Sequence, residues 1–132
     1  MKEVQAALKF REKLGIKGDE AAGLSRKAKR MFSMTLTEGA ISSFLFAYSK
    51  AKNENVKKLL SNYEEYKNLE KEEGEWGLIA AFLIKEALSD MKLDGDLVNL
   101  MNKLHEKDVR MKVERATLRY LEALGKVLDA YS

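Results

Sequence analysis

The sequence contains no cysteine, no proline and a single histidine among its 132 residues. The absence of cysteine excludes a disulfide-bonded scaffold and any metal site with thiolate ligands. The absence of proline favours helices joined by short turns, because proline interrupts helices. The single histidine, His105, has no second histidine or cysteine with which to build a catalytic triad or a zinc site. We therefore expect no catalytic residues, no metal and no other cofactor.

Long hydrophobic segments are also lacking. The most apolar run, Trp76 to Ile84, has about half of the roughly twenty residues that a membrane-spanning helix needs. The N-terminal residues MKEVQAALKFREK lack the apolar core of a signal peptide. We therefore expect a cytoplasmic protein that has no membrane partner.

The segment Trp76 to Met91 is the most informative stretch for the fold. Its large apolar side chains fall on every side of a helix, and a helix that is apolar all round is buried. The sequence therefore predicts an all-α protein, a compact bundle of about six to seven helices around a buried central helix at 76–91. The length predicts one helical domain over residues 1–132.

Amphipathic patterns and turn residues outline the other elements. We expect helices at 2–14, at about 19–34 with Asp19 as its cap, and from Thr35 or Thr37 onward. Gly39 lies either in the first turn of this third helix or at a kink within a longer continuous helix. Further helices are expected to about Leu69 with Asn53 or Asn55 as the cap, up to Leu104, and at about 106–130. The charged residues 71–75 predict a surface loop, and residues 93–96 predict a turn with Asp94 or Asp96 as the next cap. Expected core-facing residues are Val4, Ala7, Leu8, Leu14, Leu24, Ala28, Met31, Phe32, Ile41, Phe44, Leu45, Tyr48, Val56, Leu59, Leu60, Tyr63, Tyr66, Val109, Val113, Ala116, Tyr120, Leu124, Val127 and Tyr131.

The net charge is only +3, but its distribution is uneven. Residues 1–35 carry nine Lys and Arg against four Asp and Glu, and residues 107–132 carry six against four. The intervening residues carry nine against thirteen. Basic ends and an acidic middle are compatible with a polyanionic partner and also with self-association through opposite faces.

Two helices place their cations on one face. The first set is Arg26, Lys27, Lys29 and Arg30, and the second is Lys112, Arg115, Arg119 and Lys126. The second set falls within about 60° of arc, in one row along the helix. Such a row can contact successive phosphates of a nucleic acid without recognising its base sequence. A solvated helix face remains the alternative for both sets.

Two segments resemble a known family. RKAKRMFSMTLTEGAISSFLFAYSKA (26–51) is similar to the second and third helices of the small subunit of type III-B CRISPR effectors, the Cmr complex. Gly39, Phe46 and Ser49-Lys50 match positions at which the family has Gly, Phe and Ser-Lys. LVNLMNKLHEKDVRMKVERATLRYLEALGKVL (97–128) resembles the family's closing helices, with Tyr120-Leu121-x-x-Leu124 matching the final apolar pattern.

The resemblance implies an all-helical, non-catalytic subunit that stacks head-to-tail in several copies along guide RNA and target RNA, beside the backbone subunits of the complex. Two departures leave the small subunit of type III-A complexes open. The family often has Asn-Gly-Leu where this chain has Glu38-Gly39-Ala40, and a Trp near the position of Ala123. A stand-alone helical adaptor that binds acidic proteins, without nucleic acid, is the alternative from another class.

Overall fold

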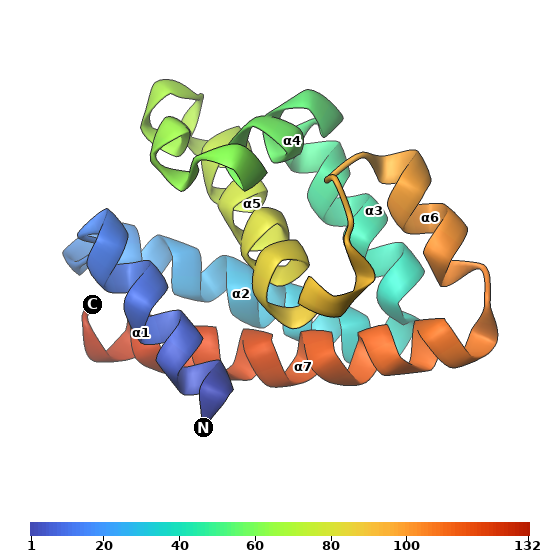
Figure 1. Cartoon of the computed structure of the whole chain (residues 1–132). Coiled ribbons are helices and arrows are strands. Elements are labelled where there is room, and N and C mark those ends of the chain that lie inside the picture. Colours follow the sequence, from blue (N-terminus) through green and yellow to red (C-terminus); the bar gives the residue numbers. More distant parts are fainter.

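The computed structural model describes residues 1–132 and contains helices only, which confirms the predicted all-α class (Figure 1). The chain contains seven α-helices. They are α1 (Lys2–Leu14), α2 (Gly18–Glu38), α3 (Ala40–Ala51), α4 (Asn53–Ser61), α5 (Lys71–Phe82), α6 (Leu97–Leu104) and α7 (Lys107–Ala130). Two 3₁₀ segments, η1 (Tyr63–Asn68) and η3 (Ser89–Met91), and one π-helical turn, η2 (Leu83–Ala87), complete the chain.

Helix α5 is the centre of the bundle, as predicted. Every residue from Gly74 to Ile84 is buried, and α2, α3, α4 and η1 all contact this helix. The core is one cluster of 34 buried residues. The expected bounds of 76–91 are wrong at both ends, because α5 begins at Lys71 and the chain after Phe82 passes into the π-helical turn and then into η3.

The predicted surface loop at 71–75 is wrong, since these residues form the first turn of α5. The side chain of Glu70 accepts a hydrogen bond from the backbone N–H of Glu72 and caps the helix. Acidic residues are favourable in a first turn, where they face the positive end of the helix dipole. Gly74 is required there, because a Cβ atom would lie 2.7 Å from the carbonyl oxygen of Tyr66.

The predicted helix starts at Thr35 and at Thr37 are both wrong, and so is the expected end of the preceding helix near residue 34. Helix α2 continues through Thr35, whose hydroxyl donates to the carbonyl of Met31 at 2.8 Å, and it ends at Glu38. Gly39, which has φ +91°, separates the two helices, and α3 begins at the next residue. The cap of α3 comes from the distant helix α7, because Glu114 accepts a hydrogen bond from the N–H of Ala40 at 2.9 Å.

This cap gives a first prediction. We expect Gly39→Ala to destabilise the protein by about 1–3 kcal/mol, because the site has a positive φ that side chains disfavour. A Cβ there would also lie 2.8 Å from the Glu114 carboxylate. We expect Glu114→Ala to cost about 1 kcal/mol, as for the loss of other helix caps. Urea unfolding of both variants measures these losses. If Gly39→Ala unfolds at the same urea concentration as wild type, the proposed strain at the junction of α2 and α3 is contradicted.

Helix α4 ends at Ser61, eight residues before the predicted end at Leu69. The side chain of Asn62 accepts from the N–H of Glu64 and starts η1 instead. This tighter turn buries both Tyr63 and Tyr66, whose phenol groups have raised pKa values because of their burial. Likewise, Lys17 rather than Asp19 is the N-cap residue of α2, and Lys52 rather than Asn53 or Asn55 is that of α4. The cap of α6 is Asp96, as expected.

Most of the expected core residues are buried or half-buried, but not all. The exceptions are Val4, Leu8, Ile41, Leu45 and Tyr131, which are 36–43% exposed. Phe10, which the sequence did not indicate, is buried against Tyr63 and Phe82. The expected positions of α1, α6 and α7 are confirmed to within a residue.

Candidate nucleic-acid interface

Helix α7 forms one long side of the molecule, with α1 and α2 packed against it (Figure 1). Its buried residues, among them Val113, Thr117, Tyr120 and Leu124, hold one face against the core. All four predicted cations of this helix, Lys112, Arg115, Arg119 and Lys126, are exposed on the other face. The predicted orientation of this row is therefore confirmed.

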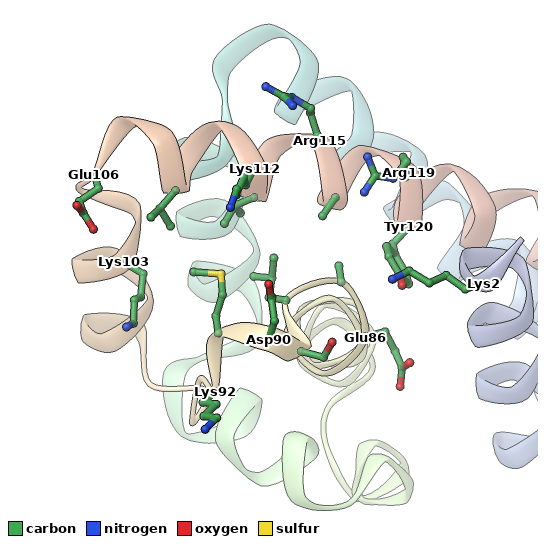
Figure 2. A pocket seen from close by; sticks show the side chains of 17 residues that line it. Lys2, Glu86, Asp90, Lys92, Lys103, Glu106, Lys112, Arg115, Arg119 and Tyr120 are labelled. Atoms are coloured by element: carbon green, nitrogen blue, oxygen red, sulfur yellow. The ribbon is translucent and has the colours of Figure 1, made fainter.

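A groove of about 780 Å³ lies beside α7, between it, α6 and the segment 86–92. Three of the four row residues, Lys112, Arg115 and Arg119, line this groove. Figure 2 shows Lys112 and Arg119 near the side of α7 that faces the groove, whereas Arg115 extends away at its edge. Lys126 lies outside the groove and forms a 3.9 Å ion pair with Glu122.

The cations of α7 differ in whether they form ion pairs within the chain. The Nε atom of Arg119 lies 3.3 Å from a carboxylate oxygen of Glu3, in an exposed ion pair. Lys112 and Arg115 have no ion pair or side-chain hydrogen bond within the chain. Their charges are therefore free to meet a ligand.

Three further lysines, Lys2, Lys92 and Lys103, line the same groove from three other parts of the chain. Sequence reasoning missed them, because each stands alone in its own segment and only the fold brings them beside α7. Three carboxylates, from Glu86, Asp90 and Glu106, line the groove as well (Figure 2). Six cations against three carboxylates leave the groove positive.

The predicted basic face of α2 is partly neutralised within the molecule. Lys27 lies 2.7 Å from the buried carboxylate of Glu75. Lys29 lies 2.6 Å from Asp129, and the hydrogen bonds from Lys29 and Ser25 lower the pKa of that carboxyl group. Two of the four predicted charges on this face are therefore already balanced by carboxylates.

The remaining two cations of α2, Arg26 and Arg30, lie at a smaller hollow of about 290 Å³. The guanidinium of Arg30 stacks over the ring of Phe46, 4.7 Å from its centroid. Neither arginine has an ion pair within the chain. The structure thus presents two basic surfaces, a large groove along α7 and a smaller hollow beside α2.

No group of three or more acidic or histidine side chains is placed to hold a metal ion, and His105 is exposed at the end of α6. None of the helices is both long and apolar enough to cross a membrane. Comparison with known proteins finds no matching family, no matching curated protein and no matching solved structure.

Proposed function

We propose that this protein is a non-catalytic, cytoplasmic RNA-binding subunit of a type III CRISPR effector complex. In this proposal several copies stack head-to-tail along guide RNA and target RNA, next to the backbone subunits. The observation that carries it is the positive groove along α7, in which Lys112 and Arg115 have no partner within the chain. The resemblance of residues 26–51 and 97–128 to the Cmr small subunit supports the particular complex.

The chemistry of this groove favours phosphate contact. Lysine and arginine side chains on one helix face neutralise successive phosphates and release bound counterions, whatever the base sequence. The α2 face contributes less free charge, since Glu75 and Asp129 neutralise two of its lysines. We therefore assign the primary RNA contact to α7, and a secondary contact to Arg26 and Arg30.

The test is the double variant Lys112→Ala/Arg115→Ala. We expect its unfolding free energy to stay within about 0.5 kcal/mol of wild type, because both side chains are exposed and unpaired. We expect RNA binding to weaken for all sequences, and the slope of log affinity against log salt to fall by about two. The measurement is fluorescence anisotropy of labelled RNA with the assembled complex, and with the isolated chain at low salt.

The matched control is Lys58→Ala/Lys71→Ala, which removes two exposed, unpaired lysines from α4 and the start of α5. We expect this control to leave the salt slope nearly unchanged. Equal effects of the two double variants would contradict a specific role for α7. Salt-sensitive binding to acidic proteins with no binding to RNA would instead support the adaptor alternative.

A further inference from the structure

The exposed apolar side chains of this protein gather in two patches at opposite ends of the molecule. Figure 1 shows α1 and the C-terminus at one end of α7, and α3 and α6 at the other end. The first group, which we call the α1 patch, is Met1, Val4, Leu8 and Tyr131. The second group, which we call the α3 patch, is Leu36, Ile41, Leu45, Val98 and Met111. These two groups contain every large hydrophobic side chain that is exposed.

The α1 patch is one continuous strip. Met1, Val4 and Leu8 recur at spacings of three and four, so they share one face of α1. Arg11 lies one turn beyond Leu8, and its guanidinium stacks over the ring of Tyr131, 3.7 Å from the centroid. Tyr131 therefore continues the strip past the end of the helix face.

The α3 patch is drawn from three helices that meet. Ile41 and Leu45 are one turn apart on the same face of α3. Glu114 caps the start of α3, so Met111, one turn earlier on α7, lies at the same corner. Helix α6 packs on both α3 and α7 and carries Val98, which is 66% exposed. Clustered apolar surface of this kind marks an interaction site more often than scattered exposed residues do.

The charges that surround the two patches have opposite sign. The exposed charged residues of α1 are Lys2, Lys9, Lys13 and Glu12. The exposed carboxylates near the α3 patch, none of them in an ion pair, are Glu38, Asp94 and Asp108. The exposed lysines near that patch are Lys52 and Lys107. A basic rim on one patch and an acidic rim on the other favour contact between unlike ends and oppose contact between like ends.

We propose that the α1 patch of one copy docks on the α3 patch of the next copy, so that the chains assemble into an open row. The assignment rests on the stacking in the proposed function and adds the two surfaces that meet. A contact between two different surfaces leaves one of each free at the ends, so it does not stop at a dimer. The 24 residues of α7 span about 36 Å between the two ends, so a row of copies repeats the α7 groove at regular intervals.

The test uses two variants of the full chain, Leu8→Glu and Leu45→Glu, each of which places a charge in one patch. Both side chains are exposed, so we expect the helical circular dichroism spectrum to be unchanged. In sedimentation velocity, we expect wild type to form oligomers that grow with concentration. Each variant alone should associate about tenfold more weakly, because a charge without a partner is desolvated at the contact.

An equal mixture of the two variants is the decisive sample. Leu8→Glu keeps an intact α3 patch and Leu45→Glu keeps an intact α1 patch, so we expect the mixture to form dimers with wild-type affinity and nothing larger. The matched control is Ser61→Glu, which adds a carboxylate at an exposed position of α4 outside both patches. We expect this control to assemble as wild type does.

Three results overturn the inference: a wild-type chain that stays monomeric up to about 1 mM, a closed dimer that only one of the two variants disrupts, or a mixture that associates no better than its components. RNA binding by α7 is measured separately, by fluorescence anisotropy at low salt, and none of these results removes it. Assembly without any RNA binding would instead overturn the RNA-binding part of the proposed function and leave the interface standing. The two failures are therefore distinguishable.

Discussion

Trp76→Ala should destabilise the protein by about 3–5 kcal/mol, the usual loss when a large buried aromatic side chain is removed. Trp76 is fully buried in α5, at the centre of the bundle. Its ring meets the ring of Phe46 edge to face, with centroids 5.2 Å apart, and its indole N–H donates to Glu72 at 3.0 Å. The substitution therefore leaves a cavity between α3 and α5 and removes a hydrogen bond.

Denaturant unfolding followed by circular dichroism measures this loss. The control is Trp76→Phe, which keeps an aromatic ring but loses the N–H donor, and should cost less than the alanine variant. A loss below about 1 kcal/mol for Trp76→Ala would show that the site is not in a close-packed core. That result would contradict the central position of α5.

Substitution of one member of the ion pair between Lys27 and Glu75 should cause the second large loss of stability. Its atoms lie 2.7 Å apart, and the side chains are only 18% and 4% exposed. Removal of one member of a buried pair leaves an uncompensated charge, which typically costs about 3–5 kcal/mol. We expect Lys27→Met to reach this range, because Glu75 is then left alone inside the protein. Glu75→Leu should cost less, since the long Lys27 side chain can turn toward solvent.

The double variant Lys27→Met/Glu75→Leu is the decisive comparison. An apolar pair of similar volume often replaces a buried ion pair without loss, so we expect stability within about 1 kcal/mol of wild type. A double-mutant cycle in urea measures the coupling between the two sites. Additive losses would contradict the ion pair. Unchanged RNA binding by the folded double variant would show that Lys27 serves the fold rather than the ligand.

Much of the fold could be predicted because its signals are local. The apolar run from Trp76 to Ile84 has no polar side on which to face water, so its burial follows from the sequence alone. The cations of α7 share one face because of helical periodicity, and their exposure follows once the opposite face is apolar.

The errors arise where a distant residue decides the local structure. Residues 71–75 are highly charged and predict a loop, but Glu75 is buried because Lys27 lies beside it, 48 positions away. Thr35 and Glu38 match a capping box, but Glu114 of α7 caps α3 instead. The groove was not predictable either, because its second wall is an irregular segment that only tertiary packing places opposite α7.

The central claim is that the groove along α7 meets RNA, and direct crosslinking tests it most directly. The complex of the full chain with a mixed-sequence RNA is irradiated with ultraviolet light, and crosslinked peptides are mapped by mass spectrometry. We predict crosslinks in α7 around Lys112 and Arg115 and in the facing segment 86–92, which line one groove. Crosslinks confined to α4 and η1, on the other side of the bundle from α7, would contradict the claim (Figure 1).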